Sequence, residues 1–537
     1  MTPRMTPRNP ILRGFNPDPS IVRVGEDYYV ATSTFEWYPG VQIHRSRDLV
    51  DWTFVGRPLA RASQLDMRGN PDSCGVWAPD LTHADGRFHL IYSDVKRYGQ
   101  TTVDGARGAS LRDFHNYWVS SEHIDGPWSD PVYLNSSGFD PALFHDDDGR
   151  SWLLNMLWDH RPGRSRFAGI VVQQMDLRSG ALLGERRLIF EGTALGFTEG
   201  PHLYKRDGWY HLIVAEGGTE RNHAVVMARS RSLFGPYDAH PDGPVLTAMG
   251  KPDAPLQRTG HGDLVETPAG ETWMAYLCGR PLPHSDRCVL GRETAIQPMR
   301  WGEDGWLRTV AGDATPLSNM PGAAAETPVV EHSDFEDGTL PPAFQWLRTP
   351  YPEHLFSLTA APGYLRLYGR ETIGSHFTQS LVARRQQAFR YHAETRVEFD
   401  PQHFQQAAGL VCYYNSTKFH YLHVTTDDAG ARQIQVLSAV PTETGSSLLS
   451  APMLIGPGPI ALRVEVDHEV LRFGYRIADA ADWSWLPGSF DASILSDEAT
   501  LPGLPNFTGT FVGMACQDMS GAGRPADFAY FHYVERP

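Results

Sequence analysis

Five acidic residues recur at a nearly regular spacing in the first half of the chain. Asp18, Asp80, Asp140, Glu199 and Asp263 are separated by 62, 60, 59 and 64 residues. Carboxylates that are brought together repel one another when charged, so at least one of their pKa values rises. A pair of carboxylates with separated pKa values supplies a general acid and a base or nucleophile, which is the chemistry that cleavage of a glycosidic bond requires.

Each acidic residue belongs to a repeated unit, and the unit predicts the element that positions it. An acidic element, often beside Pro, precedes a turn and an aromatic-rich apolar run, as in DPSIVRVGEDYYVATS from Asp18 and DPALFHDDDGRSWLLNM from Asp140. Asp-Gly between apolar runs, as at Asp207-Gly208, is a strong hairpin signal. Two hairpins in about sixty residues form a four-stranded antiparallel sheet, and five such sheets around an axis predict a five-bladed β-propeller.

The propeller explains how residues far apart in the chain meet. The innermost strand of each blade lines the axis, so equivalent residues converge at one end of the central channel. Asp18, Asp140 and Glu199 occupy equivalent places in the first, third and fourth units, and we expect them to form one acidic site. An Asp before Pro is also a common turn opener. Asp80 and Asp263 therefore fit a simpler role, in which they tie blades together.

The pattern changes near residue 320. The stretch SNMPGAAAETPVVEHSDFEDGTLPP is rich in Pro, Gly, Ala and acidic residues, which is typical of a linker. Later segments such as KFHYLHVTTDD and IALRVEVDHEVLRFGYRIA alternate apolar and polar residues with period two. We therefore predict an all-β chain with a propeller at 1–320, a linker at 321–335 and a β-sandwich of lectin or jelly-roll type at 336–537.

Composition limits the class of partner and the compartment. The chain has 537 residues, which is too many for one hydrophobic core, and its net charge of −16 argues against nucleic acid or an anionic membrane as a partner. The N-terminus lacks the apolar region of a secretory signal. The five scattered cysteines fit free thiols in a reducing compartment, so we expect the protein in the cytoplasm.

Several aromatic and polar residues beside the acidic elements are candidate substrate contacts. Phe35, Trp77 and Phe197 lie in loop contexts, and aromatic rings stack on the apolar C–H faces of sugars. His261 opens the fifth unit and is suited to bind a sugar hydroxyl or a metal, although a structural histidine fits the sequence equally well. Arg292, in VLGRETAIQP, is suited to bind sugar hydroxyls and to hold a neighbouring carboxylate ionised.

At these residues the chain resembles glycoside hydrolase family 43, and in particular its two-domain β-xylosidases. The resemblance runs from about residue 9 to the C-terminus. The matching words are GFNPDPSI, STFEWYPGVQIHRSRDLVDW, GVWAPDL, GFDPALFHDDDGRSWLLNM, TEGPHLYKRDGWYHL, GHGDLVET, LGRETAIQP and FTGTFVGMACQD. Each word alone is weak, but the joint pattern is specific.

The resemblance implies residue roles and inversion at the anomeric carbon. By position, Asp18 matches the general base that activates water, and Glu199 matches the general acid. Asp140 matches a third carboxylate that raises the pKa of the acid and orients it. The positions that match the substrate pocket are Phe35, Trp77, His261 and Arg292, together with Phe507 of the second domain, which closes the pocket from outside.

A closed pocket implies exo-action. The resemblance therefore predicts release of xylose from the non-reducing end of short β-1,4-xylo-oligosaccharides, with side activity on α-L-arabinofuranosides. The expected partners are xylo-oligosaccharides, xylose and L-arabinose, and a homo-oligomer is expected. No cofactor is required by these residues. Some relatives hold a calcium ion on the propeller axis near the histidine that matches His261 and others need no metal, and the sequence leaves both open.

Four alternatives compete with this prediction. A dedicated α-L-arabinofuranosidase would use the same pocket, whereas an endo-acting arabinanase would have an open groove and no need of Phe507. A retaining fructan hydrolase is disfavoured, because the acid word here is Thr-Glu-Gly and no Arg-Asp-Pro word is present. The alternative from another class is a non-catalytic sugar-binding propeller with the sandwich as a carbohydrate-binding module.

Overall fold

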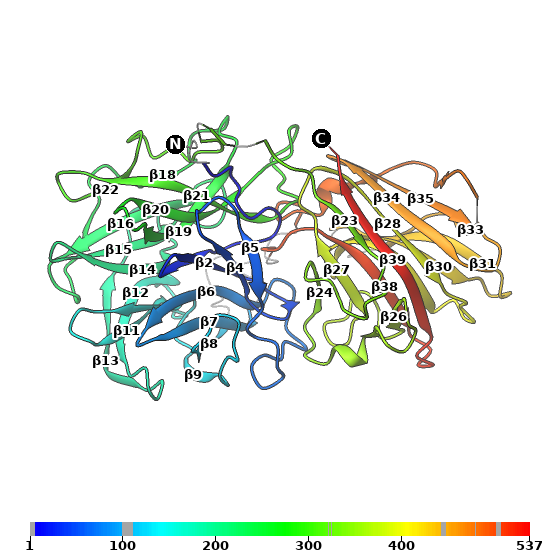
Figure 1. The fold of residues 1–537 in the computed structure, drawn as a ribbon, viewed down its shortest axis with the longest axis horizontal. Helices are drawn as coiled ribbons and strands as arrows, with labels where there is room; N and C mark the ends of the chain where they lie inside the picture. Colours follow the sequence, from blue (N-terminus) through cyan, green and yellow to red (C-terminus); the bar gives the residue numbers. More distant parts are fainter. Residues whose placement is uncertain are drawn as a thin grey trace.

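The computed structural model describes residues 6–98, 111–320, 322–323, 325–441, 447–477, 480–500 and 506–536. A propeller and a β-sandwich lie side by side (Figure 1). Two short 3-10 helices, η1 (Pro352–His354) and η2 (Ala492–Ile494), are the helical elements of this described part, which contains no α-helix. The all-β prediction is confirmed.

The propeller consists of five antiparallel sheets, and each sheet follows chain order from its first strand to its outer edge. The first blade contains β1 (Ser20–Val24), β2 (Asp27–Thr32), β4 (Gln42–Ser46) and β5 (Thr53–Gly56), and the second contains β6 (Gly75–Ala84), β7 (Arg87–Arg97), β8 (Asp113–Ser121) and β9 (Val132–Asn135). The third contains β10 (Ala142–His145), β11 (Ser151–Trp158), β12 (Phe167–Met175) and β13 (Leu182–Phe190), and the fourth contains β14 (Glu199–Arg206), β15 (Trp209–Glu216), β16 (Ala224–Ser230) and β17 (Asp238–Ala239), with β18 (Leu246–Thr247) beside β16. The fifth contains β19 (Gln257–Glu266), β20 (Thr272–Gly279), β21 (Arg292–Trp301) and β22 (Leu307–Thr309). The five-bladed prediction is therefore confirmed.

The Asp-Gly turns form the hairpins that the sequence predicts. Asp207 and Gly208 join β14 to β15 with φ values of 50° and 71°. Asp85 and Gly86 join β6 to β7 with φ values of 51° and 73°. A tight hairpin turn with positive φ at both central residues matches the right-handed twist of the flanking strands, and Asp-Gly adopts it at low cost.

The N-terminal segment closes the ring of blades. Leu12 forms a bridge to Thr294 in β21 of the fifth blade. The Asn9 side chain donates to the carbonyl of Ile296 at 2.7 Å and accepts from its N–H at 2.9 Å. The start of the chain therefore reaches the last blade before it enters the first blade through β1.

Two sheets form the sandwich, and its core is the apolar cluster between them. One sheet has the order β25 (Phe356–Ser357), β26 (Leu365–Tyr368), β39 (Pro525–Glu535), β28 (Arg390–Glu398), β34 (Ile460–Asp467), β35 (Val470–Ile477) and β36 (Ser484–Trp485), with β23 (Val330–Ser333) beside β39 and β37 (Phe490–Asp491) beside β35. The other has the order β3 (Trp37–Tyr38), β24 (Phe344–Leu347), β27 (Leu381–Arg385), β38 (Phe511–Asp518), β29 (Gln406–Asn415), β30 (Lys418–Thr426), β31 (Arg432–Ala439) and β32 (Ser447–Leu449), with β33 (Met453–Leu454) beside β31. The expected linker, 321–335, contains β23.

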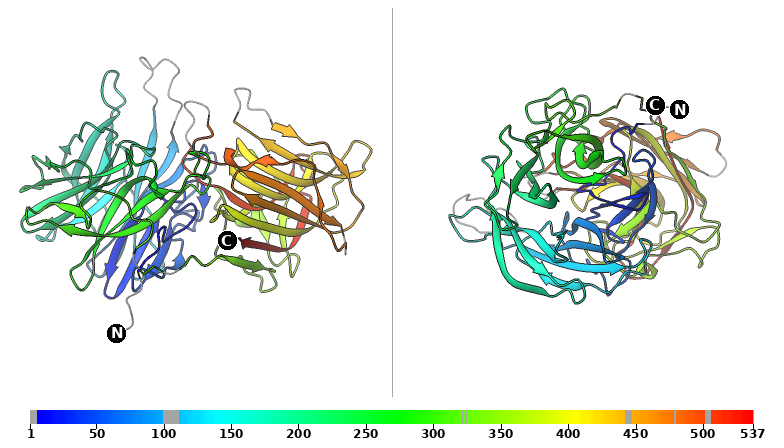
Figure 2. Two further views of the ribbon diagram at one scale, coloured as in Figure 1. Left: turned by 90° about the horizontal axis from the view of Figure 1, so that it is seen from above. Right: turned by 60° about the vertical axis from the view of Figure 1, so that its left-hand side comes forward.

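The propeller contributes one strand to the sandwich. In the antiparallel pair of β3 with β24, Trp37 lies opposite Leu347 and Tyr38 opposite Trp346. The Trp37 ring is fully buried and stacks on Phe511 of the sandwich at 3.6 Å between ring centroids. An apolar cluster that includes Trp37 and Phe511 continues across the boundary between the domains. Figure 2 shows the two domains joined along this broad contact.

Two further expectations concern thiols and membranes. All five cysteines belong to the described part of the chain, and each one is buried and unpaired. Within the same described part, no helix is long and apolar enough to cross a membrane.

Candidate active site

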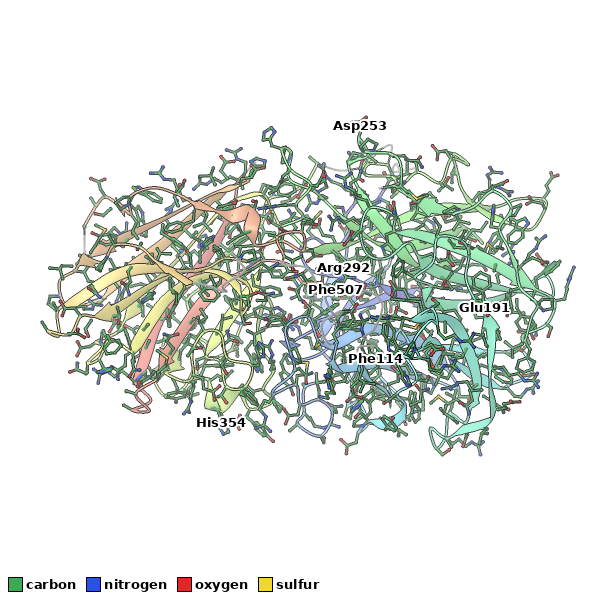
Figure 3. The ribbon with its side chains drawn as sticks, turned by 180° about the vertical axis from the view of Figure 1, so that it is seen from behind. Phe114, Glu191, Asp253, Arg292, His354 and Phe507 are labelled. Atoms are coloured by element: carbon green, nitrogen blue, oxygen red, sulfur yellow. The ribbon has the colours of Figure 1, made fainter. Side chains whose placement is uncertain are left out.

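A cavity of about 830 Å³ lies at one end of the propeller, against the sandwich. It brings together every site residue predicted from the sequence. These residues are Asp18, Phe35, Trp77, Asp140, Phe197, Glu199, His261, Arg292 and Phe507. Figure 3 shows Arg292 of the propeller beside Phe507 of the sandwich where the two domains meet.

The backbone aims two of the carboxylates by an uncommon conformation. Asp18 and Asp140 are each separated by one proline from the first strands of blades one and three, and their φ values are 54° and 52°. Non-glycine residues rarely adopt this left-handed conformation, and such residues concentrate at functional sites. Glu199 is the first residue of β14, at the equivalent end of blade four. All three side chains are at least nine-tenths buried.

Asp18 is held by two side-chain donors. Arg292 Nη1 donates to Asp18 Oδ1 at 2.9 Å, and Ser33 Oγ donates to Asp18 Oδ2 at 2.7 Å. Charge-assisted bonds between guanidinium and carboxylate are strong and directional. They fix this carboxylate in one orientation in the pocket, as a base that must meet a single water molecule requires.

Glu199 and Asp140 are carboxyl groups that favour the protonated form. Burial, followed by the charge of Asp18, raises the pKa of Glu199 to about 8, against the opposing charges of Arg292 and Arg112. Burial and the charges of Glu199 and Asp18 raise the pKa of Asp140 well above its ordinary value. A carboxyl group that keeps its proton near neutral pH is suited to act as a general acid.

The contacts of Gly200 show why a glycine follows the acid in the Thr-Glu-Gly motif. Its N–H donates to Asp140 Oδ2 at 3.0 Å, and its φ is +57°. A Cβ at this position would lie 2.9 Å from Nδ1 of His261. Burial lowers the pKa of His261 to about 4, so its imidazole is neutral. The glycine therefore lets Glu199, Asp140 and His261 approach one another.

Aromatic rings from both domains form one wall of the cavity. The ring centroids of Phe35 and Trp77 are 5.5 Å apart, and Phe507 lies 6.4 Å from Phe35 and 5.6 Å from Trp77. Arg292 Nη2 donates to the carbonyl of Phe507 at 3.0 Å, and the Phe507 N–H donates to Ser73 Oγ at 3.1 Å. The sandwich therefore supplies a side of the pocket, and Arg292 connects that side to Asp18.

The sequence did not reveal the outer wall of the cavity. The Arg112 guanidinium lies 3.5 Å from the ring centroid of Tyr98 and 4.1 Å from that of Trp158. Tyr98 also contacts Trp77, with 5.4 Å between centroids. Tyr98, Arg112 and Trp158 stand at or beyond the ends of second and third strands, where the blades differ. No repeated signal marks these positions. The one sequence feature that pointed to any of them is Trp158, an aromatic residue at the end of the apolar strand SWLLNMLW.

A second acidic cluster lies further along the innermost strands. Candidate ligand atoms of Asp80, His202 and Asp263 lie within 4.8 Å of one another. Asp80 accepts from the N–H of Leu143 at 2.7 Å, and Asp263 accepts from the N–H of Ile21 at 2.7 Å. Each of these bonds joins two blades. The hypothesis that Asp80 and Asp263 tie blades together is confirmed.

This second cluster makes a poor calcium site by its own atoms. Calcium takes six to eight oxygen ligands, whereas the cluster offers two carboxylates and an imidazole nitrogen. Its carboxylates already accept hydrogen bonds from Ser20, Ile21 and Leu143. The ring of His261 lies 6.3 Å from that of His202. A calcium ion on the axis would therefore take most of its ligands from water.

A pocket that combines buried carboxylates with aromatic walls has the groups that a glycoside hydrolase requires. The chain belongs to the glycosyl hydrolases family 43, and the sequence model of this family matches residues 7–307. Residues 332–534 match the beta xylosidase C-terminal concanavalin A-like domain. The lectin-type sandwich predicted from the sequence is therefore confirmed.

Relatives match over nearly the whole chain. It is 50% identical to "Xylosidase/arabinosidase 43B" of Humicola insolens, over 99% of this chain and 98% of the relative. It is 48% identical to "Beta-xylosidase" of Bacillus subtilis, over 98% and 99%. The crystal structure of xylan beta-1,4-xylosidase from Bacillus halodurans superposes with a TM-score of 0.92 at 48% identity, over 99% of this chain and all of that one.

Proposed function

We propose that the protein is an inverting, exo-acting glycoside hydrolase that releases xylose from the non-reducing end of short β-1,4-xylo-oligosaccharides. The observation that carries this proposal is the closure of the carboxylate pocket by Phe507 of the second domain, which Arg292 holds through its carbonyl. A pocket closed on one side accommodates a chain end better than the middle of a polymer. The names of the similar proteins support the choice of xylosides.

The three carboxylates divide the work in this proposal. Glu199, protonated near neutral pH, donates its proton to the leaving oxygen. Asp18, held by Arg292 and Ser33, accepts a proton from the attacking water on the opposite face of the sugar. Asp140 is a positioning residue, because it accepts the N–H of Gly200 directly after the acid. Water bonds to the anomeric carbon from the face opposite the departing oxygen, and the bond to that oxygen breaks. Asp18 takes one proton and Glu199 gives one, so the protons balance in each turnover.

Side activity on α-L-arabinofuranosides is the second part of the proposal. Xylopyranose and arabinofuranose present similar hydroxyl geometry, and one relative is named for both activities. The alternative of a dedicated arabinofuranosidase predicts the opposite ratio of the two rates.

We also propose a compartment and a state of assembly. Five buried, unpaired cysteines support action in the reducing cytoplasm on oligosaccharides that have been imported. We propose a homo-oligomer, which light scattering on the purified protein tests directly.

One experiment tests the function. An aryl β-xyloside, whose leaving group is not a sugar, is hydrolysed in an NMR tube, and the anomer of xylose that forms first is recorded. Rates are also measured on xylobiose, on the aryl β-xyloside and on an aryl α-arabinofuranoside. We expect α-xylose first, and a faster rate on the xyloside. Initial β-xylose would contradict inversion, a faster arabinoside would favour the arabinofuranosidase, and binding without turnover at any pH would favour the non-catalytic propeller.

A further inference from the structure

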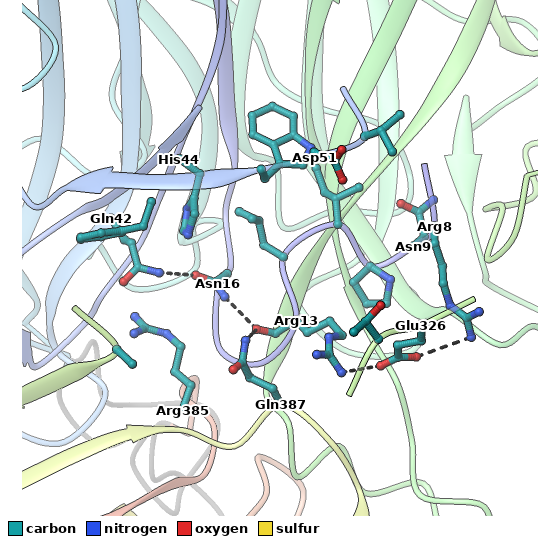
Figure 4. Close-up of a pocket in the computed structure, with 18 of the residues that line it drawn as sticks. Arg8, Asn9, Arg13, Asn16, Gln42, His44, Asp51, Glu326, Arg385 and Gln387 are labelled. Carbon is teal, nitrogen blue, oxygen red and sulfur yellow. Dashed lines mark hydrogen bonds and ion pairs between the residues drawn. The ribbon is translucent and has the colours of Figure 1, made fainter. Parts of the chain in front are cut away.

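Another cavity, of about 510 Å³, lies between the N-terminal segment, the first blade and the sandwich. Figure 4 shows Gln42 and His44 of β4 facing Arg385 of β27 across this space. The cavity is separate from the active-site pocket, since the two share none of their lining residues. Nothing in the proposed reaction uses it.

Two guanidinium groups at this cavity lack a carboxylate partner. Arg385 is 5% exposed, and its Nε and Nη1 donate to the carbonyl of Phe15 at 2.5 Å and to Gln345 Oε1 at 2.6 Å. Arg57 Nη2 donates to Gln42 Oε1 at 2.6 Å and to the carbonyl of Pro342 at 2.9 Å. All four acceptors are neutral. Within the described ranges, neither arginine forms an ion pair.

Hydrogen-bonding capacity remains on both groups. Arg385 Nη2, Arg57 Nε and His44 Nδ1 are buried atoms without a hydrogen-bond partner among the residues that the structure describes. Burial and the charge of Arg57 lower the pKa of Arg385 well below its ordinary value, and burial lowers that of Arg57 to about 9. Two like charges placed together in a buried site are costly unless an anion compensates them.

The carboxylates that line the cavity do not supply this compensation. Among the described lining residues they are Asp51 and Glu326. Glu326 pairs with Arg8 at 3.5 Å and also with Arg13, and Figure 4 shows this group apart from Arg385. The end of the cavity at Arg57 and Arg385 is therefore cationic.

We propose that this cavity binds a small oxyanion, of the phosphate, sulfate or carboxylate class, through the guanidinium groups of Arg57 and Arg385, which both line it. The planar fork of arginine matches the oxygens of such anions, and these charge-assisted bonds are strong when water is excluded. Arg57 belongs to the propeller and Arg385 to the sandwich, so a bound anion stabilises the contact between the domains. Arg385 also holds the carbonyl of Phe15, three residues before Asp18.

Calorimetric titration of the full-length protein tests the proposal. Inorganic phosphate, sulfate and acetate are titrated separately at constant ionic strength, which distinguishes the members of the class. We expect saturable binding of at least one anion at one site per chain. Arg57→Gln and Arg385→Gln should each weaken it by about tenfold or more, because a charge-assisted bond is lost. The same anion should raise the melting temperature of the wild type, and not that of Arg57→Gln.

Arg8→Gln is the matched control, because Arg8 lines the same cavity but pairs with Glu326. It should change the affinity less than about twofold, as expected for an exposed ion pair. Absence of saturable binding for all three anions would overturn the proposal, and so would equal losses in Arg8→Gln and Arg57→Gln. Loss in Arg292→Gln with retention in Arg57→Gln would place the anion in the catalytic pocket and also overturn it. If Arg385→Gln does not fold, the partly exposed Arg57 decides the outcome.

Discussion

Two acidic clusters lie along the propeller axis, and they use the same residue types differently. At the pocket end, both oxygens of Asp18 accept from side chains, Arg292 and Ser33. Further along the strands, Asp80 and Asp263 each accept a backbone N–H from a neighbouring blade. Asp80 and Asp263, which accept backbone N–H groups, therefore belong to the scaffold. Asp18 is held only by side chains and lines the cavity, so it can contact a substrate.

Asp140 shows that the distinction is graded. It faces the cavity, yet one of its oxygens accepts the N–H of Gly200 in the next blade. It shares the left-handed backbone of Asp18 and the inter-blade bond of Asp80. A residue of this kind is expected to position the acid and to contribute to stability at the same time.

The sharpest test of the comparison is Asp18→Asn. The amide keeps the shape of the side chain but cannot accept a proton from water, so we expect a loss of about 10³-fold in kcat on both xylobiose and an aryl xyloside. The melting temperature should fall, because Arg292 loses its buried ionic partner, so kcat is measured well below it. Appreciable activity on either substrate would contradict the role of Asp18 as the base.

Glu199→Gln should separate the acid from the base. Without a proton donor, hydrolysis of xylobiose should fall by about 10²–10³-fold, while an aryl xyloside with a good leaving group should lose far less. The measurement is the ratio of kcat/KM for the two substrates. Equal losses on both would remove Glu199 from the role of acid.

Asp263→Asn should lower stability without lowering kcat, unlike Asp18→Asn. The Ile21 N–H and the Tyr204 hydroxyl both donate to Asp263, and disturbing these buried bonds should cost about 1–3 kcal/mol of folding free energy. A lower melting temperature with nearly unchanged kcat below it is expected. Asp253→Asn, at an exposed position, serves as the control. A stable but inactive Asp263 variant would abolish the distinction between the clusters.

The fall of kcat at high pH should report the acid of the pocket cluster. Since the pKa of Glu199 is raised to about 8, its acid form persists at neutral pH, and kcat should fall as pH rises through about 8. The folded state binds this proton more tightly than the unfolded one, so stability should decline between about pH 4.5 and 8. Glu199→Gln should make that decline smaller, and the raised pKa of Asp140 should leave part of it in place. Arg112→Gln should move the fall in kcat to higher pH, because the Arg112 charge lowers the pKa of Glu199. Arg308→Gln is the control: this arginine pairs with Asp242 on the propeller surface, and its loss should leave the pH of the fall in kcat unchanged.

The smallest effect is expected from metal removal. Because the carboxylates of Asp80 and Asp263 already accept hydrogen bonds from the protein, we expect EDTA to leave kcat and the melting temperature unchanged within error. Inactivation by EDTA that added calcium reverses would show that the second cluster is more than scaffold.

Repetition in the sequence explains what could be predicted and what could not. The acidic units recur because each blade starts in the same way, so the propeller and the convergence of Asp18, Asp140 and Glu199 could be predicted. Tyr98 and Arg112 lie where the blades differ, and a single copy leaves no periodic signal. The cavity at Arg57 and Arg385 joins two domains, and the distance along the chain hides it. These features depend on tertiary packing rather than on local pattern.

The pairing of β3 with β24 has a consequence for the way this protein can vary. A two-residue strand from the propeller completes the edge of a sandwich sheet. A propeller separated from its partner would expose the backbone donors and acceptors of β3 and the apolar face of Trp37, which invites association with other chains. The second domain is therefore not an exchangeable accessory. Recombination that supplied a different C-terminal domain would have to supply a matching strand edge as well, so the two halves are expected to be inherited together.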